Sequence, residues 1–259
     1  MRFGICASLA ELEAVTAAGY NYIELPVSAL LQPEQPEVGV MPPLIARLAA
    51  SRLTPETFNL LLPGDLKVVG SETDPERQSR YLEAAFRRAK LLGGEIAVFG
   101  SGGARRIPEG WPEAEASRQM LAFLGRAGEA AQRHGMAVAI EPLNSAECNF
   151  ISSVDEASAL VAKADHPAVG VLSDLYHVAH DGQSYDETRD AARWLLHVHV
   201  AGMGRRAPTA EDHEFLVGYF AVLKGRGYTG RISVEARWED LGAQAADALR
   251  VLKRAWEAA

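Results

Sequence analysis

Residues 113–141 read EAEASRQMLAFLGRAGEAAQRHGMAVAIE, and this stretch contains one helix followed by one strand. The pattern rich in Ala, Leu, Arg and Glu predicts a helix over residues 113–134, and Gly135 is the residue type expected just past its C-terminus. Residues 137–141 are apolar up to Glu141 and predict a strand that Pro142 ends. An apolar strand flanked by such helices is typical of a parallel sheet that helices cover.

The same alternation extends to both ends of the chain. Strands are predicted over residues 3–6, 22–25, 56–60, 96–99, 137–141, 169–174, 197–200 and 232–235. Helices are predicted over residues 9–18, 42–51, 75–92, 113–134 and 241–256, and another begins after Ser153, which has the acid expected three residues later. Eight units of about 32 residues each predict an α/β protein with a single (β/α)8 TIM barrel. A doubly wound open sheet is the alternative, but no G-x-G-x-x-G follows the first strand.

The composition indicates one ordinary globular domain over residues 1–259. Of the 259 residues, 48% are hydrophobic and 23% are charged, and no Pro-rich linker or charge block divides the chain. The net charge of −8 argues against a nucleic-acid partner. Two cysteines, Cys6 and Cys148, cannot form a disulfide framework and are typical of a reducing compartment. Without an apolar run long enough for a signal peptide or a membrane span, we expect a soluble cytoplasmic protein with no membrane partner.

Charged or imidazole side chains interrupt the last four predicted strands near their C-terminal ends. These residues are Glu141, Asp174, His199 and Glu235, separated by 33, 25 and 36 residues. The separations are close to one β/α unit, about 32 residues, so the four side chains occupy equivalent heights on successive strands. In a closed barrel those strand ends converge on the mouth where active sites of this fold lie.

Three carboxylates that converge on a small volume repel one another unless a cation compensates. Oxygen-rich ligation with one imidazole nitrogen favours Mn²⁺, with Mg²⁺ or Co²⁺ as alternatives, over a structural zinc. Any one of these acids taken alone is more readily explained as a helix N-cap or a surface carboxylate, and the metal site is favoured by the four together. His197 is two residues before His199 and shares its strand face, and we expect His197 to be buried and hydrogen-bonded rather than a ligand. The histidines outside the strands are expected to be solvated; they are His134, His166, His180 and His213.

At these positions the chain resembles the sugar isomerase/epimerase branch of the xylose isomerase-like TIM barrels. The pattern is similar to that of D-tagatose and D-psicose 3-epimerases, with hydroxypyruvate isomerase nearby. The matching segments are residues 140–147, 174–177 (D-x-x-H), 197–199 (H-x-H), 205–208 (R-R-x-P) and 234–235. The resemblance covers the C-terminal half well, whereas the N-terminal half matches only in layout.

The resemblance implies a role for each matching residue. It implies that the metal ligands are Glu141, Asp174, His199 and Glu235, and that Glu141 and Glu235 are also the catalytic acid and base. It further implies that Glu147, His177 and Arg205 contact the substrate. The substrate would be a small carbohydrate.

Isomerisation or epimerisation of a ketose begins with removal of a proton from a carbon beside the carbonyl group. A divalent ion promotes this step by polarising the carbonyl and stabilising the enediolate. With Glu141 and Glu235 on opposite sides of the ion, one could remove the proton and the other return it. We therefore expect a divalent-metal-dependent isomerase or epimerase that acts on a ketose or a related keto-polyol.

Three other functions remain open. A metal-dependent lyase or dehydratase of the inosose or 3-dehydroshikimate type would use the same ligands and expel a β-hydroxyl group. A phosphodiesterase related to apurinic endonucleases would need more histidine ligands and a basic groove. A non-catalytic sugar-binding barrel would not need two metal-bound carboxylates. The particular sugar, its phosphorylation or oxidation, and assembly into a homo-oligomer are also left open.

Two features of the N-terminal half have two interpretations each. Residues 100–106, GSGGARR, could form a basic loop that binds a substrate carboxylate or phosphate, or a solvated turn. Trp111 could form a wall of the substrate pocket or pack between helices.

Overall fold

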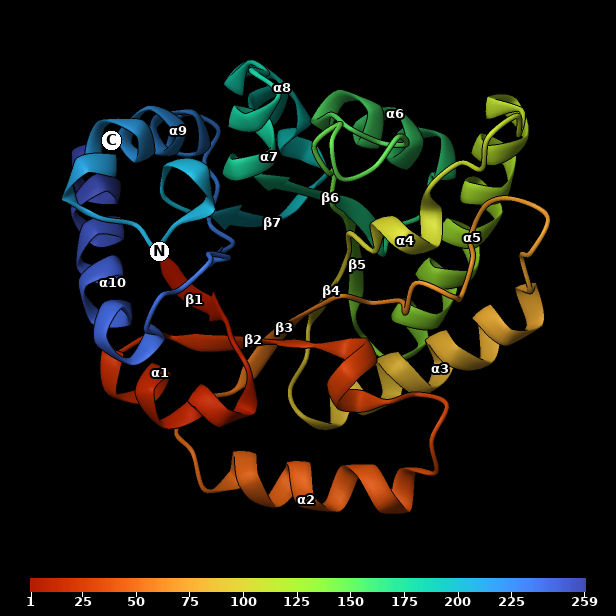
Figure 1. Cartoon of the computed structure of the whole chain (residues 1–259), viewed down its shortest axis with the longest axis horizontal. Coiled ribbons are helices and arrows are strands. Elements are labelled where there is room, and N and C mark those ends of the chain that lie inside the picture. The colour runs from red at the N-terminus through yellow and green to blue at the C-terminus, as the bar shows by residue number, and fades with distance from the viewer.

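The computed structural model describes residues 1–259 and has eight parallel strands that close into a barrel, with β8 paired back to β1 (Figure 1). The strands are β1 (Arg2–Cys6), β2 (Tyr22–Pro26), β3 (Pro55–Asn59), β4 (Ile96–Phe99), β5 (Ala137–Ile140), β6 (Val169–Asp174), β7 (Leu195–Val200) and β8 (Arg231–Val234). The predicted single (β/α)8 TIM barrel is confirmed. Glu141 and Glu235, predicted as the last residues of their strands, directly follow β5 and β8.

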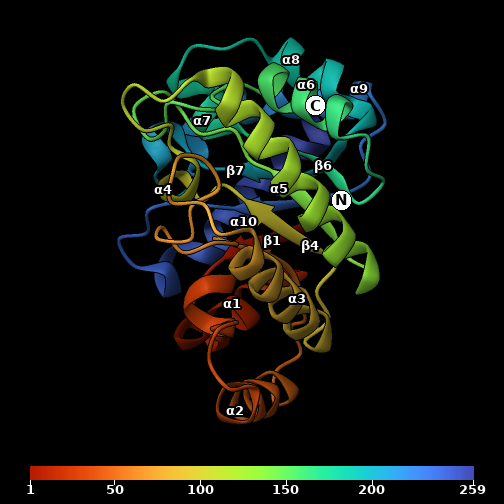
Figure 2. The same cartoon turned by 90° about the vertical axis from the view of Figure 1, so that its right-hand side faces the viewer.

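Helices surround the barrel, and α2 lies outermost, beyond α1 and α3 (Figures 1 and 2). The α-helices are α1 (Leu12–Ala18), α2 (Glu37–Ala49), α3 (Pro75–Leu91), α4 (Gly102–Arg105), α5 (Glu113–Arg133), α6 (Val154–Ala164), α7 (Leu175–His180), α8 (Tyr185–Asp190), α9 (His213–Gly225) and α10 (Leu241–Ala258). Shorter turns are η1 (Leu9–Glu11), η2 (Val27–Leu31), η3 (Ala191–Arg193), η4 (Met203–Arg205) and η5 (Ala210–Asp212). None of the helices combines the length and the apolar character needed to span a bilayer.

Local sequence explains where several helices begin. Ser153 caps α6 as predicted, since its side chain accepts a hydrogen bond from the amide of Glu156. The prediction for α2 was wrong at its start: the helix begins at Glu37, after Pro36, and contains Pro42 and Pro43. Proline is favoured in the first turn of a helix, and here Pro36 rather than Pro42 stands at that boundary.

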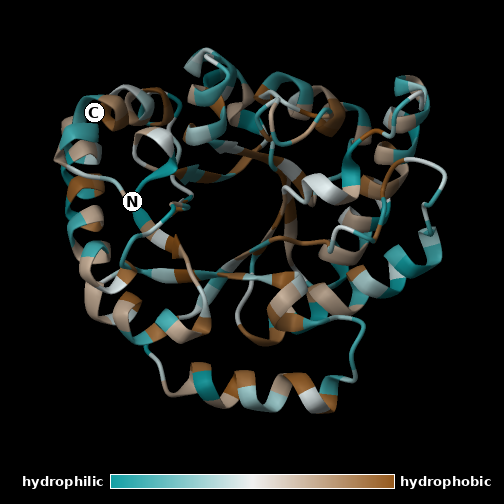
Figure 3. Cartoon of the chain, viewed as in Figure 1, coloured by the Kyte–Doolittle hydropathy of each residue, from teal (hydrophilic) through white to brown (hydrophobic).

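The hydrophobic core lies between the barrel and the helices. Figure 3 shows hydrophobic segments along the strands and an alternation of hydrophobic and hydrophilic segments along the helices. The long helices α3, α5 and α10 each have a buried face that contributes to this core. Packing of these faces against the sheet is what holds the strand ends in fixed relative positions.

Inside the barrel, the strand register groups inward-facing side chains into layers of four that come from alternate strands. The two layers nearest the C-terminal mouth are Cys6, Asn59, Glu141 and His199, and above them Pro26, Gly100, Asp174 and Glu235. The layer below the first of these contains Glu24, Val98, Leu172 and Ser233. Acidic residues and one imidazole are therefore concentrated at one end of the barrel.

Candidate metal centre

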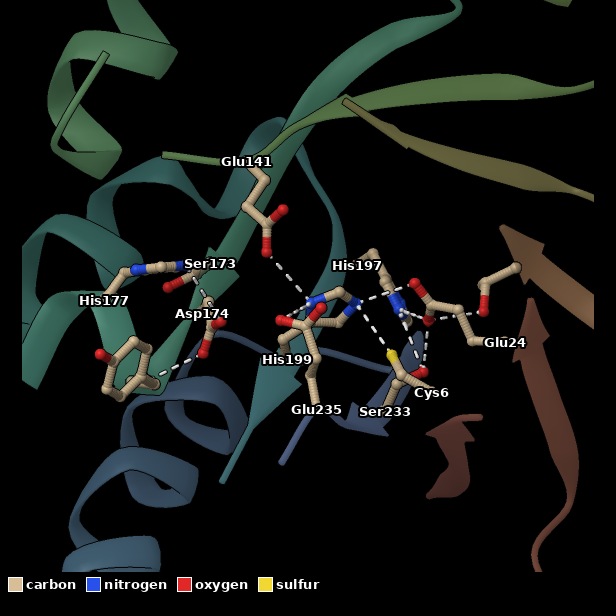
Figure 4. A network of polar contacts seen from close by, with 12 residues as sticks. Cys6, Glu24, Glu141, Ser173, Asp174, His177, His197, His199, Ser233 and Glu235 are labelled. Carbon is tan, nitrogen blue, oxygen red and sulfur yellow. Dashed lines mark hydrogen bonds and ion pairs between the residues drawn. The ribbon is translucent and has the colours of Figure 1, made fainter. Parts of the chain in front are cut away.

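The structure brings together the four residues that the sequence predicts as ligands. Glu141, Asp174, His199 and Glu235 each offer one ligand atom, and these four atoms lie within 4.8 Å of one another (Figure 4). His199 is fully buried, and its Nδ1 lies 3.2 Å from Glu141 Oε1 and 3.5 Å from Glu235 Oε2. The cluster thus combines residues from four strands that are far apart in the sequence.

Asp174 is both the N-cap of a helix and a member of the cluster, the two alternatives that its sequence position allowed. Its Oδ1 accepts a hydrogen bond of 2.8 Å from the amide of Tyr176 and so caps α7. Its Oδ2 is buried and has no hydrogen-bond partner, although it belongs to a carboxylate. A buried carboxylate oxygen without a partner is costly, and a cation in the cluster would supply one.

Mutual repulsion in the cluster is visible in the pKa values. Burial, followed by the charge of Glu235, raises the pKa of Asp174 to about 7, and the same two causes raise the pKa of Glu141. For Glu235 burial acts upward, but His199 and Arg205 outweigh it and lower the pKa to about 2. Burial also opposes the charge on His199, yet Glu24 and Cys6 raise its pKa well above the usual value. Three carboxylates and one imidazole that compete for protons in this way fit a divalent cation.

Gly100 makes room for Glu141. A Cβ atom at position 100 would lie 2.1 Å from Glu141 Oε2 and 3.2 Å from its Cδ. No side chain larger than hydrogen can therefore occupy this position while Glu141 keeps its place in the cluster.

The three predicted substrate-binding residues also lie at the cluster. The Arg205 guanidinium donates hydrogen bonds to Glu235 Oε2 at 2.6 Å and to Glu147 Oε1 at 3.3 Å, and it lies over the ring of Tyr176. His177 is buried, and its Nε2 lies 3.7 Å from Asp174 Oδ2. Burial, followed by the positive charge of Arg205, lowers the pKa of His177 to about 3, so its imidazole is neutral.

The loop that carries Arg205 is fixed by a buried carboxylate. Arg205 has a left-handed backbone conformation with φ of 66°. Asp212 is fully buried and accepts hydrogen bonds from the amides of Met203 (3.0 Å) and Thr209 (2.8 Å) and from the Arg206 guanidinium (2.5 Å). These contacts close the segment between β7 and α9 and hold Arg205 over the cluster.

The structure shows where residues 100–106 and Trp111 lie, each of which had two interpretations. Arg105 is fully buried and donates a 2.7 Å hydrogen bond to the carbonyl of Glu141, so its guanidinium is a structural group beneath the site. Arg106 donates to the carbonyl of Glu147, and the segment forms the short helix α4. Burial of Arg105, with its Nε and Nη1 unpartnered, fits neither a solvated turn nor a solvent-facing anion-binding loop, whereas Arg106 is exposed. Trp111 packs against the hydrophobic core, which was its alternative role.

His197 is buried and hydrogen-bonded to Glu24, as the sequence analysis expected. The expectation of solvated histidines holds for His180, which is exposed, but His134 is partly buried and lies 2.7 Å from Glu83 Oε1. His166 is also partly buried, against Gly128.

Sequence reasoning missed two inward-facing residues of the N-terminal half. Glu24 is fully buried on β2 and lies 3.0 Å from His199 Nε2. Asn59, at the end of β3, is 8% exposed, and its Oδ1 has no hydrogen-bond partner. The signal was present for Glu24, because it interrupts the apolar run 22–25 just as the ligand candidates interrupt theirs.

Comparison with known proteins places this geometry in context. Residues 12–255 of the chain match a protein family described as "Xylose isomerase-like TIM barrel". A putative hydroxypyruvate isomerase of Streptomyces coelicolor is 31% identical over 238 residues, which are 86% of this chain and 82% of that protein. The structure of D-allulose 3-epimerase from Methylomonas sp. superposes with a TM-score of 0.82 at 21% identity, covering 98% of both chains. That of 3-keto-D-glucoside 4-epimerase from E. coli gives 0.80 at 20% identity, covering 98% of this chain and 99% of the other.

Proposed function

Because the chain belongs to the xylose isomerase-like TIM barrel family, we propose that it is a divalent-metal-dependent isomerase or epimerase of a ketose or related keto-polyol. The observation that carries the proposal is the cluster of Glu141, Asp174, His199 and Glu235, whose ligand atoms lie within 4.8 Å of one another. The names of the similar proteins, a hydroxypyruvate isomerase and two sugar epimerases, support the same reaction class.

The proposed ligands favour Mn²⁺, with Mg²⁺ or Co²⁺ as alternatives, because three of the four are carboxylates. When bound, the cation would polarise the substrate carbonyl and offset the negative charge that develops during proton removal. The donor set has no thiolate, since Cys6 Sγ lies on the other side of the His199 ring, 4.0 Å from Nε2.

Glu141 and Glu235 are the proposed acid and base. They approach Nδ1 of His199 from β5 and β8, three strands apart around the barrel. One carboxylate takes the proton from the carbon beside the carbonyl, and the other gives a proton back to the same carbon (epimerisation) or to its neighbour (isomerisation). In epimerisation one proton leaves the substrate and one returns; in isomerisation the hydroxyl proton also passes to the former carbonyl oxygen.

Arg205, Glu147 and His177 are the proposed substrate-binding groups. Arg205 and Glu147 form an ion pair across the cluster, and each can exchange this contact for a substrate hydroxyl or carbonyl oxygen. His177 is neutral, and its Nδ1 accepts a hydrogen bond from the amide of Asn144, so its unpartnered Nε2 carries the ring proton and can donate one hydrogen bond to the substrate. We also propose that residues 1–259 act as one domain in the cytoplasm, which is consistent with the free thiols of Cys6 and Cys148.

The test is proton exchange with solvent. Ketoses, keto-acids and inososes are incubated with the Mn²⁺-loaded protein in D₂O, and deuterium at the carbon beside the carbonyl is measured by NMR. We expect incorporation with at least one ketose and about one bound divalent ion per chain. Glu141→Gln and Glu235→Gln should each slow exchange on the order of 1000-fold, whereas Glu109→Gln, at an exposed loop position, is the matched control.

Three outcomes would contradict the proposal. Exchange at the wild-type rate in both glutamine variants would exclude the two-glutamate mechanism. Absence of bound metal after incubation with Mn²⁺ would exclude the metal centre. Release of water with the absorbance of an enone would identify the lyase or dehydratase alternative instead.

A further inference from the structure

Glu24 lies directly beneath the candidate metal centre, on the side of His199 opposite the three carboxylates of the cluster (Figure 4). It is fully buried, as are His197 and His199. The cost of burying an ionised carboxylate is several kcal/mol, and apolar residues of similar size fill a barrel interior at lower cost. A buried glutamate at this position therefore indicates a function other than packing.

The two oxygens of Glu24 have unequal surroundings. Oε2 accepts three hydrogen bonds, from His197 Nε2 (2.9 Å), Thr57 Oγ1 (2.8 Å) and Ser233 Oγ (2.6 Å). Oε1 has a single hydrogen-bond partner, His199 Nε2, at 3.0 Å. The three donors on Oε2 fix the rotation of the carboxylate, and Oε1 is thereby directed at His199.

The group that fixes Oε2 is itself held by packing lower in the barrel. Ser233 Oγ lies 2.8 Å from the hydroxyl of Tyr22, whose ring lies across the barrel interior. Gly4 leaves space for that ring, since a Cβ atom at position 4 would lie 2.1 Å from Tyr22 Cε2. The orientation of Glu24 thus depends on donors from β3, β7 and β8, and through Tyr22 and Gly4 also on β2 and β1.

An imidazole can bind a cation only through a nitrogen that carries a lone pair. On His199 the nitrogen that faces Glu141 and Glu235 is Nδ1, at 3.2 and 3.5 Å from their nearest oxygens. For Nδ1 to have its lone pair free, the ring proton must be on Nε2. A carboxylate that accepts a hydrogen bond from Nε2 selects this tautomer and fixes the plane of the ring.

We propose that Glu24 is the positioning residue of the metal centre: its Oε1 holds the ring proton of His199 on Nε2, so that Nδ1 is presented to the cation. This inference rests on the proposed metal centre and adds a residue that its four ligands do not include. His197, Thr57 and Ser233 act one step further away, by holding Glu24 Oε2.

Glu24→Gln tests whether the carboxylate of Glu24 decides which ring nitrogen of His199 carries the proton. The amide keeps the shape of the carboxylate but has a single acceptor oxygen. Three donors compete for that oxygen at the Oε2 position, so the NH₂ group is expected to face His199 Nε2. An NH₂ group there donates to Nε2 and drives the ring proton to Nδ1, where it blocks the cation. Thr188→Val is the matched control, because it removes the hydroxyl of another buried threonine, one that bonds to Ser173, and leaves every contact of Glu24 in place.

Two measurements are made on the full chain. The Kd for Mn²⁺ is measured by calorimetry, and the position of the His199 ring proton is measured by ¹⁵N–¹H NMR in the presence of diamagnetic Mg²⁺. Glu24→Gln should raise the Kd about 10- to 100-fold and leave the ring proton on Nδ1 at a Mg²⁺ concentration at which the wild type carries it on Nε2. Thr188→Val should change the Kd less than about threefold. Glu24→Asp, which keeps the charge but retracts it, should have an intermediate Kd and is the second variant if Glu24→Gln fails to fold.

A Kd and a His199 tautomer in Glu24→Gln equal to those of the wild type would overturn the inference while leaving the proposed function in place. An equal loss of affinity in Glu24→Gln and Thr188→Val would also overturn it, because a general loosening of the protein interior would then explain both. A wild-type protein that binds no divalent ion would overturn the proposed function and the inference together.

Discussion

Replacing Gly100 by alanine should disable the proposed metal centre without replacing any of its ligands. The added Cβ would lie 2.1 Å from Glu141 Oε2, whereas atoms that are not bonded pack at about 3.5 Å. The carboxylate must therefore move by about 1 Å or more, and displacements of that size cost on the order of 100-fold in function. We expect the Kd for Mn²⁺ to rise about 100-fold, which corresponds to about 2.7 kcal/mol.

Gly103→Ala is the matched control for this prediction. Gly103 lies three residues away in α4, and a Cβ atom there would meet its nearest neighbour, Gly64 Cα, at 3.4 Å, which is an ordinary contact. Calorimetric titration with Mn²⁺ and thermal melts without metal are measured for both variants. If Gly100→Ala bound Mn²⁺ within threefold of the wild type while remaining folded, Glu141 would not be a ligand in the position described.

Three further predictions concern pH, the Arg205 loop and the barrel interior. The pKa of Asp174 is raised to about 7, mainly by burial, and a raised carboxyl pKa gives stability that is lost as the pH rises through it. The metal-free protein should therefore lose about 1 kcal/mol in urea unfolding between pH 6.5 and 8; Asp174→Asn should lose less, and equal losses would contradict the shift. Asp212→Ala leaves Arg206 and two backbone amides without their acceptor. It should cost about 3 kcal/mol in urea unfolding and raise the KM for sugar, and an unchanged KM would show that the loop does not position the substrate. Gly4→Ala forces a Cβ atom against the ring of Tyr22 and should lower the free energy of unfolding by about 3 kcal/mol. A melting temperature equal to that of the wild type would contradict this prediction.

Much of the fold followed from local pattern. The eight strands were predicted to within one or two residues, because their apolar runs are short and are bounded by glycine, proline or acidic residues. The start of α2 was wrong, since a proline inside a helix looks the same in sequence as a proline that begins one. The four ligand candidates could be found because each interrupts an apolar strand at a spacing of about one β/α unit.

Other parts of the site could not be read in this way. Glu24 interrupts an apolar strand too, but nothing local indicates that it lies under His199, 175 residues away. Arg105 had the sequence of a solvent-facing loop residue and is fully buried, because the carbonyl of Glu141 accepts its hydrogen bond across 36 residues. The Glu24–His199 and Arg105–Glu141 contacts form only when the barrel closes, so no local pattern around any of the four residues predicts them.

The sequence by itself determined which side chains face into the barrel, because inward and outward positions alternate along each strand and this alternation is local. Only the tertiary structure decided which of them share a layer. Layer membership depends on the shear accumulated over all eight strand pairings and closed by β8 against β1. Glu141 and His199 share a layer with Asn59, and Glu24 lies below them, for this reason alone: a register shift in any one pairing would displace them relative to one another.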